Sequence, residues 1–434
     1  MNTRSPLART VLHSCLVFTL LVTSSVAGPA PARVVAVADV HGAYEEFVAL
    51  LQSVRLIDSR RAWKGGDATL VQTGDVLDRG ARSRECLDLM MDLEREAPRA
   101  GGAVIPLIGN HEVMNVIGDL RYVTPAMFRT FAAGDSEARR EQAYKDYLKF
   151  LSAHDGHAHA IVPPGDDAAR QKWMDGHPFG FFEHREAFGP GGKYGKWIRS
   201  NHAVVQVGDG VFVHGGVNPA LEFGSVRELD ERVMADLAAF DVMWQALVDA
   251  GVIWSYMDFG EAVRFAEEEQ KWRQAPGHTE EFKAGPAVTR LLGYKSWITV
   301  SADGPLWYRG LATEPEEKLA AGLSAMLDRL GVAYIVAGHS VVAGKEVAAR
   351  FGRRVFLIDT GMLPEAYDGR ASALEIRDGS FVAHQVNRTP RLLPPPARRD
   401  GASAGTCATR TSAAAQHRFS SAWPRIAASR PASR

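Results

Sequence analysis

Short apolar runs that each end in a polar residue constrain the fold of this chain more than any other feature. Three such runs, each with the polar residue that follows it, are 34–38 with Asp39, 68–73 with Asp75, and 103–108 with Asn110. Helical patterns separate the runs, with apolar residues at helical spacing over 47–54 and an amphipathic stretch over 83–95. Apolar strands that alternate with helices indicate buried parallel strands in an α/β sheet.

The rest of the chain continues this mixed pattern. We expect further strands in a hairpin over 203–214, at 334–337 and 354–358, and in a second hairpin that joins 373–377 to 381–383 across Asp378-Gly379. Between 115 and 200 we expect polar loops around one helix at 136–152, and we expect 225–275 to be largely helical. Thr313 and Glu316 form a capping-box pattern before an apolar stripe at 319–330, and Gly331 closes that helix.

Five polar motifs follow the predicted strands. They are Asp39-Val-His41-Gly, Gly-Asp75-Val-Leu-Asp78-Arg79-Gly, Gly-Asn110-His111-Glu, His214-Gly-Gly and Gly-His339. Each motif alone is common in loops and turns. The carboxyl ends of strands in an α/β sheet meet at one edge, so together the motifs bring three carboxylate or amide oxygens and three imidazoles to one place. That mixture suits two transition-metal ions such as Mn, Fe, Zn or Co, with one carboxylate as a bridge.

The order and spacing of these motifs resemble the calcineurin-like metallophosphoesterases, and in particular their phosphoprotein phosphatase branch. The resemblance rests on Gly-Asp-x-x-Asp-Arg-Gly at 74–80 and Gly-Asn-His-Glu at 109–112. The segments 107–123, 213–217 and 305–310 further resemble the bacterial Shewanella-like protein phosphatases, several of which are known to prefer phosphotyrosine. The resemblance implies an α/β fold of two packed mixed β-sheets flanked by helices, with inserted helical cap segments.

The resemblance also implies a role for each matching position. The metal ligands would be Asp39 and His41 for one ion, Asp75 as the bridge, and Asn110, His214 and His339 for the second ion. His111 would be the general acid that protonates the leaving oxygen, oriented by Asp78. Arg79 would grip the phosphoryl oxygens as a planar bidentate donor, and Arg309 is the candidate for a second phosphate arginine. Paired metal ions lower the pKa of a water and stabilise both the attacking and the leaving oxygen.

Several positions depart from the family pattern. Ala38 replaces a usual glycine, and Ser340 replaces a usual threonine. The segments 115–200 and 220–330 are longer than in the compact Ser/Thr phosphatases, and we expect them to form a substrate cap. The Ser-Ala-Pro-Asn-Tyr-Cys segment of the eukaryotic Ser/Thr members is missing from the sequence. Substrate specificity therefore does not carry over from the compact branch.

Both ends of the chain differ in composition from the catalytic domain expected at 28–389. Residues 1–27 combine two arginines with an apolar stretch and small residues at 25–27, which predicts a cleaved export signal, with an uncleaved anchor as the alternative. Export points to the periplasm. Residues 390–434 are rich in Arg, Ala and Ser without periodicity, which predicts a disordered tail. The residues between carry a net charge of about −10, which argues against a nucleic-acid binder.

The predicted activity is metal-dependent hydrolysis of phosphomonoesters, in proteins or peptides and with phosphotyrosine favoured by resemblance. One alternative is a hydrolase of dinucleoside polyphosphates or other small phosphoesters, which shares the same motifs. A second alternative is a phosphate-binding pseudo-enzyme, which the intact motifs disfavour. The aromatic residues of 177–200 either line a pocket for an aryl phosphate or pack the inserted cap.

Overall fold

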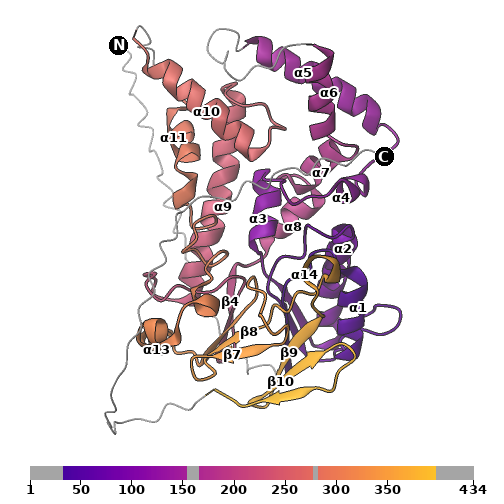
Figure 1. The fold of residues 1–434 in the computed structure, drawn as a ribbon, viewed down its shortest axis with the longest axis vertical. Helices are drawn as coiled ribbons and strands as arrows, with labels where there is room; N and C mark the ends of the chain where they lie inside the picture. The colour runs from indigo at the N-terminus through magenta and orange to yellow at the C-terminus, as the bar shows by residue number, and fades with distance from the viewer. Residues whose placement is uncertain (1–32, 154–165, 277–281, 397–434) are drawn as a thin grey trace, which may run out of the picture. The chain divides into compact units, whose positions relative to one another are not determined.

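The computed structural model describes residues 33–153, 166–276 and 282–396, in which two mixed β-sheets are flanked by helices (Figure 1). The first sheet has the strand order β11-β10-β9-β1-β2-β3. Its strands are β1 (Arg33–Val37), β2 (Thr69–Gln72), β3 (Ala103–Pro106), β9 (Ser372–Arg377), β10 (Ser380–Gln385) and β11 (Arg391–Leu393). Strands β1, β2 and β3 pair in parallel, as their apolar sequences predict, whereas β9, β10 and β11 pair antiparallel.

The second sheet has the strand order β4-β5-β6-β8-β7. Its strands are β4 (Val204–Val207), β5 (Gly210–Val213), β6 (Tyr334–Ala337), β7 (Ala348–Arg350) and β8 (Val355–Leu357). The predicted hairpin is confirmed as the β4–β5 pair, and β5, β6 and β8 run in parallel. The short strand β7, which the sequence pattern did not predict, pairs antiparallel with β8.

The two sheets pack against each other through one apolar face of each. Along β1, Val34 and Ala36 join the core between the sheets, whereas Val35 and Val37 join the core beneath the helices. Successive strand residues point to opposite faces, so an apolar run buries both faces of the strand. In the core between the sheets, the rings of Phe356 and Phe381 stack with centroids 4.7 Å apart. The predicted α/β fold class, with two packed mixed sheets, is confirmed.

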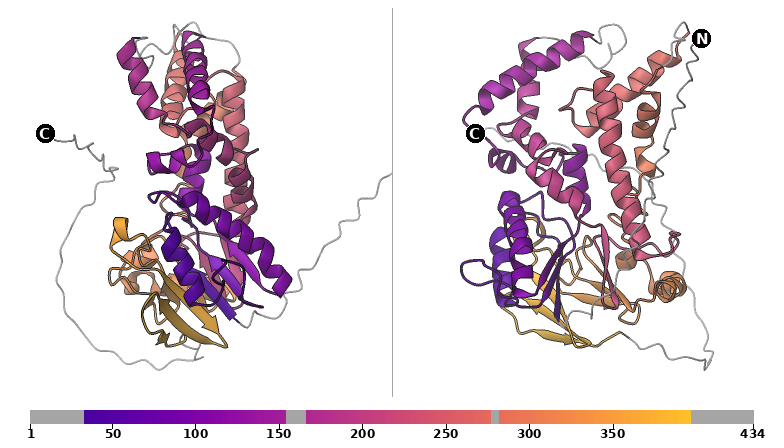
Figure 2. Two further views of the ribbon diagram at one scale, coloured as in Figure 1. Left: turned by 90° about the vertical axis from the view of Figure 1, so that its right-hand side faces the viewer. Right: turned by 180° about the vertical axis from the view of Figure 1, so that it is seen from behind.

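Helices α1 (Tyr44–Ser53), α2 (Ser83–Glu96) and α13 (Glu316–Leu330) lie beside the sheets (Figure 2). Residue Gly331 ends α13 in the left-handed conformation, as predicted. The predicted capping box is wrong, because Thr313 is the last residue of a separate helix, α12 (Gly310–Thr313), and its hydroxyl donates to the carbonyl of Arg309. Pro315 precedes the first residue of α13 instead.

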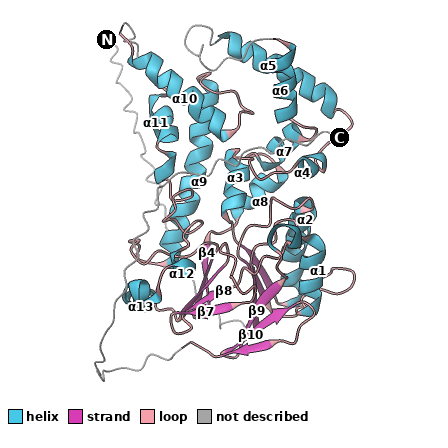
Figure 3. Cartoon of the chain, in the orientation of Figure 1, coloured by secondary structure: helices cyan, strands magenta, loops and turns pink. Residues whose placement is uncertain are grey.

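Most of the remaining helices belong to two long insertions between strands, and they gather away from the sheets (Figure 3). The first insertion holds α3 (Asn110–Ile117), α4 (Pro125–Arg129), α5 (Ser136–Ala153), α6 (Asp167–Gly176), α7 (Phe181–Phe188) and α8 (Lys193–Ser200). The second holds α9 (Val226–Asp249), α10 (Phe259–Gln274) and α11 (Gly285–Leu292) before α12 and α13. Single turns are η1 (Ala97–Ala100), η2 (Tyr294–Ser296) and the short helix α14 (Pro364–Tyr367).

The helical stretch predicted near 136–152 forms α5, but much of the segment expected to be loop is helical as well, since α4, α6, α7 and α8 also form within 115–200. Helices α6, α7 and α8 have only eight to ten residues, and such helices depend on tertiary packing more than on propensity. Phe181, Phe182, Tyr194 and Trp197 supply that packing and are buried, whereas Phe179 is 41% exposed. The four buried rings therefore match the packing interpretation of this aromatic segment.

Strand β11 corrects the expected start of the tail at residue 390. Residue Leu393 is 4% exposed and lies opposite Phe381 in the β10–β11 pair, while its neighbour Leu392 is 71% exposed. The alternation buries one leucine against the first sheet, so the ordered domain continues through this strand. The predicted signal at 1–27 and the predicted tail from residue 397 onward lie outside the described residues. Within the described ranges, no helix is long and apolar enough to cross a membrane.

Candidate active site

All six predicted metal ligands lie at the carboxyl ends of strands from both sheets, and all are buried. They follow β1 (Asp39, His41), β2 (Asp75), β3 (Asn110), β5 (His214) and β6 (His339). Two contacts join the sheets at this edge. The Asp39 Oδ1 accepts the backbone N–H of His339 at 2.9 Å, and the His214 Nδ1 lies 2.9 Å from the carbonyl of Thr73.

Three possible metal-ligand atoms lie close to the Nε2 of His214. Its Nε2 lies 2.9 Å from Asn110 Oδ1, 3.1 Å from His339 Nδ1 and 3.3 Å from Asp75 Oδ2. A second group shares Asp75: the His41 Nε2 lies 3.7 Å from both Asp39 Oδ2 and Asp75 Oδ2. The structure thus brings together every side chain predicted to hold a metal ion, in two groups joined by one carboxylate.

The chemistry of these atoms fits divalent cations. The His214 Nδ1 and the His41 Nδ1 each face a backbone carbonyl, of Thr73 and of Leu77 respectively, so each Nδ1 carries a proton. Each Nε2 faces the interior of the site, where that of His41 contacts the Arg79 guanidinium and that of His214 lies among Asn110 Oδ1, His339 Nδ1 and Asp75 Oδ2. Imidazole and carboxylate groups gathered in this way suit transition metals.

Burial and mutual charge shift the pKa values of this cluster strongly. Burial raises the pKa of Asp39 well above its usual value, and the nearby Asp359 carboxyl adds to the rise. Burial acts in the same sense on Asp75, but His214, His111 and His41 outweigh it and its pKa falls well below normal. Burial lowers the pKa of His41, whereas Asp75 and Asp39 overcome burial at His214 and raise its pKa to about 9. Perturbed groups of this kind concentrate at functional sites.

His111 is held by a carboxylate. Its Nδ1 lies 2.7 Å from Asp78 Oδ2, and its Nε2 lies 3.8 Å from Asp75 Oδ2. Burial opposes protonation of His111, but Asp75 and Asp78 outweigh burial and raise the pKa of the imidazole. Asn115, one turn further along α3, donates its amide to both Asp78 oxygens at 3.0 and 3.1 Å. The Asn115 amide therefore orients the Asp78 carboxylate, and that carboxylate orients the His111 ring.

Arg79 enters the same site from the loop after β2. Its guanidinium contacts the Nε2 of His41, and its backbone N–H donates to the carbonyl of Tyr122 at 3.1 Å. Arg309 lies beside His339, because its guanidinium donates to the His339 carbonyl at 2.9 Å and to the Ser340 hydroxyl at 3.1 Å. Both predicted phosphate arginines therefore adjoin the predicted metal ligands, from different sides.

Several candidate residues have left-handed backbone conformations. The φ angles are +48° at His41, +57° at Asp75, +70° at Asp78, +65° at Arg79 and +63° at His339. Such conformations cost of order 1–3 kcal/mol each and concentrate at functional sites. At Gly338 a side chain is excluded altogether, since a Cβ atom there would come within 2.6 Å of Asp39 Oδ1. The backbone at this edge is shaped to direct side chains inward.

Sequence reasoning assigned no role to three buried polar residues of this site. Asn115 fixes Asp78, as described above. Glu112 accepts the backbone N–H groups of Gly109 and Asp75, each at 2.7 Å, and so joins the ends of β2 and β3. Asp359 follows β8, and burial raises its pKa to about 6. The strand predicted at 354–358 ends directly before Asp359, so the rule that selected the other site residues would have found it.

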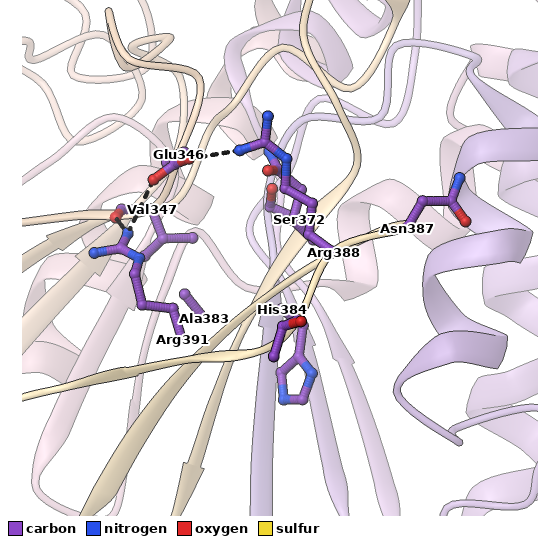
Figure 4. Close-up of a pocket in the computed structure, with 10 residues that line it drawn as sticks. Glu346, Val347, Ser372, Ala383, His384, Asn387, Arg388 and Arg391 are labelled. Carbon is purple, nitrogen blue, oxygen red and sulfur yellow. Dashed lines mark hydrogen bonds and ion pairs between the residues drawn. The ribbon is translucent and has the colours of Figure 1, made fainter.

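A pocket of about 450 Å³ lies apart from these residues, at an edge of the β9–β10–β11 hairpins (Figure 4). Glu346 pairs there with Arg388 at 2.7 Å and with Arg391 at 3.7 Å. The residues that line this pocket include none of the predicted site residues. Its arginines are already engaged by one carboxylate.

Comparison with known proteins agrees with this geometry. The chain belongs to the calcineurin-like phosphoesterase family, whose pattern matches residues 32–343, and it is a phosphoesterase hydrolase. The family fold implies divalent metal ions. Two groups of side chains whose ligand atoms lie within 4.8 Å of one another are able to hold them, namely His41, Asp75 and His111, and Asp75, His214 and His339. Members of this class hydrolyse phosphoric esters.

Individual relatives indicate which branch of the family this chain resembles. Shewanella-like protein phosphatase 2 of Arabidopsis thaliana is 29% identical over 366 residues, which cover 81% of this chain and 77% of the relative. Shewanella-like protein phosphatase 1 of Plasmodium berghei is 22% identical over 336 residues, covering 76% and 67%. The crystal structure of a cold-active protein tyrosine phosphatase from a psychrophilic Shewanella species shares the fold, with a TM-score of 0.51, 22% identity and coverage of 84% and 80%. The resemblance drawn from the motifs is confirmed.

Proposed function

We propose that this chain is an exported protein phosphatase that hydrolyses phosphomonoesters at a dinuclear metal centre and favours phosphotyrosine. The observation that carries the proposal is the convergence of donor atoms on Asp75 from two groups, one with His41 and one with His214 and His339. A carboxylate shared by two groups of imidazole ligands is the arrangement that two neighbouring cations need. Phosphorylated proteins or peptides are the expected partners.

The proposed metal ligands follow from the donor sets. Asp39 and His41 would hold one ion, Asn110, His214 and His339 would hold the second, and Asp75 would be shared between the two groups. Mn, Fe and Zn are the candidate metals, because the site mixes imidazole with oxygen ligands. Two such ions supply an activated water and stabilise the attacking and leaving oxygens of an in-line displacement.

His111 is the proposed general acid. The Asp78 carboxylate, 2.7 Å from Nδ1, favours the imidazolium, and an imidazolium donates a proton rather than binding a metal ion. Its Nε2 is then the atom that delivers a proton to the leaving oxygen. Asp78 keeps the ring in orientation through the bond that Asn115 supports.

Arg79 and Arg309 are the proposed phosphate-binding groups. The planar guanidinium of Arg79 presents paired N–H donors that match two phosphoryl oxygens. The phosphotyrosine preference draws support from the branch resemblance and from one relative of known structure, which is described as a protein tyrosine phosphatase. Export draws support from the composition of 1–27 alone, and the periplasm is the compartment that we propose.

The test is an assay of metal-stripped protein, residues 28–434, reloaded with Mn, Zn, Fe or Mg. Substrates are matched phosphotyrosine, phosphoserine and phosphothreonine peptides beside a dinucleoside polyphosphate. We expect metal-dependent phosphate release that is fastest from phosphotyrosine. Release only from the polyphosphate would replace the substrate class and keep the metal centre. Metal binding without turnover of any substrate would instead support a phosphate-binding pseudo-enzyme.

A further inference from the structure

Two tyrosine rings lie close to the guanidinium of Arg79. Tyr122 lies in the turn that follows α3, and Tyr367 is the last residue of α14, so the two rings come from distant parts of the sequence. The guanidinium carbon of Arg79 lies 5.2 Å from the centroid of the Tyr122 ring and 5.3 Å from that of the Tyr367 ring. Both distances are within the range of a cation–π contact. Arg79 therefore contacts two aromatic rings, and the surface formed by the two rings and the guanidinium is called the slot below.

Each ring also contacts one of the site imidazoles. The Tyr122 ring lies 5.0 Å from the His111 ring, and the Tyr367 ring lies 5.8 Å from the His41 ring, centroid to centroid. The proposed function places the proton donor at His111, so the leaving oxygen lies on the Tyr122 side of the slot. Whatever group the leaving oxygen carries must pass beside that ring.

Hydrogen bonds anchor the backbones that carry the two rings. Tyr122 accepts the backbone N–H of Arg79 through its carbonyl at 3.1 Å, and Tyr367 donates its own N–H to Leu363 at 3.1 Å. Tyr367 also packs over Gly361, where an added Cβ atom would come within 2.6 Å of the Tyr367 Cβ. Both tyrosine side chains are half-buried. Fixed, partly accessible rings are suited to contact with a second ring.

We propose that Tyr122 is a specificity-determining residue whose ring packs against the aryl ring of a phenolic leaving group, with Tyr367 as the second ring of the slot. The inference rests on the proposed function, because it uses His111 as the proton donor. Offset or edge-to-face aromatic pairs contribute beyond the area that they bury, equivalent to about a 2- to 10-fold preference. A phosphoserine side chain has no ring and gains nothing from the slot.

The experiment compares kcat/KM for matched phosphotyrosine and phosphoserine peptides in the metal-loaded full chain. In Tyr122→Leu we expect the ratio of the two values to fall about 2- to 10-fold, and in Tyr122→Phe we expect it to stay at the wild-type level. Tyr367→Leu should produce a smaller fall. Tyr44→Leu is the matched control and should leave the ratio unchanged, since the Tyr44 ring centroid lies 4.3 Å from the guanidinium carbon of Arg82, which is not a predicted site residue.

A second measurement needs no turnover of a tyrosine ester. Phenylphosphonate and methylphosphonate are compared as competitive inhibitors, and the advantage of the phenyl compound should disappear in Tyr122→Leu. An equal loss on both peptides with unchanged inhibitor ratios would overturn the inference and leave Tyr122 as a positioning residue for Arg79. If wild type showed no phosphotyrosine preference while the phenyl advantage still depended on Tyr122, the aryl contact would stand and the proposed substrate preference would fail.

Discussion

The strand-end site and the helical insertions pack their side chains in opposite ways. At the site, buried polar atoms face one another across short distances, as in the 3.1 Å separation of the His214 and His339 nitrogens. In the insertions, aromatic rings fill the space between helices, as in the stack of Phe188 on Tyr194 with centroids 5.5 Å apart. The site is arranged for a bound cation and a substrate. The insertions are arranged for apolar burial.

This difference separates function from stability within one chain. Left-handed backbone and clustered acceptors at the site cost free energy, which burial of rings and aliphatic side chains elsewhere offsets. A substitution at the site should therefore change metal binding or turnover more than folding. A substitution in the insertions should change folding more than chemistry.

The largest effect is expected for Asp75→Asn. The amide lacks the charge that both groups of ligands share, so metal binding and activity should fall together. We expect activity to fall by well over ~100-fold, which is the loss typical of residues that hydrogen-bond the metal ligands without binding the metal. Elemental analysis and an aryl phosphate assay measure the two quantities. Full metal content in the purified variant would rule out a bridging role for this carboxylate.

His111→Asn should lower kcat by about 10²- to 10⁴-fold while metal content is retained, because it removes the proton donor but no proposed ligand. The loss should be smaller on an activated aryl phosphate, whose leaving group needs less protonation, than on an alkyl phosphate. Equal losses on both substrates would contradict leaving-group protonation. Loss of metal ions from the variant would instead show that His111 is a metal ligand. Its Nε2 lies 3.8 Å from Asp75 Oδ2, which is close enough for that role.

Phe188→Ala tests the helical insertions, where a substitution should change folding more than chemistry. Phe188 is buried among His184, Phe131 and Tyr194, so its truncation should lower the free energy of unfolding by about 3–5 kcal/mol. Metal content and kcat of the folded fraction should stay close to wild type. Phe179→Ala, at an exposed ring of the same segment, is the control and should cost far less. A large fall in kcat at low temperature, with the fold intact, would show that the insertion acts in the chemistry.

The insertions should also be sensitive to acid. Burial lowers the pKa of His177, stacked on Trp173 with ring centroids 4.0 Å apart, to about 4. The unfolded chain, with a histidine pKa near 6.5, therefore binds more protons between pH 4 and pH 6.5. Stability should be unaffected above pH 6.5 and should fall by up to ~3 kcal/mol as the pH drops to 4. Denaturant titrations of wild type and His177→Phe should diverge in that window; parallel curves would contradict the assignment.

The smallest effect is expected at the C-terminal edge. Removal of 397–434 should leave stability and catalysis unchanged, whereas removal of 390–434 also deletes β11 and the buried Leu393. Loss of that side chain should cost about 2 kcal/mol of stability without changing kcat. Chemical denaturation of the two truncated chains measures the difference. Equal midpoints would show that β11 contributes little to the sheet.

Much of the site could be predicted from order along the chain, because strand ends are readable. Apolar runs predicted β1, β2, β3 and β6, and the polar residue after each run lies at the site. The same rule was not extended to Asp359, although its strand was predicted. Short helices such as α6–α8 could not be predicted, since contacts with residues far along the chain hold them.

The sequence by itself determined the fold class and the chemical types that meet at the strand ends, because both depend on local pattern and on the parallel order of strands. Only the tertiary structure decided how these groups are arranged. It placed the amide of Asn115 against the carboxylate of Asp78, and it brought Tyr122 and Tyr367 from separate segments to the guanidinium of Arg79. The physical reason is that neither tyrosine belongs to a repeating pattern or a motif. Their positions follow from how α3 and α14 pack, and packing joins residues that the sequence keeps far apart.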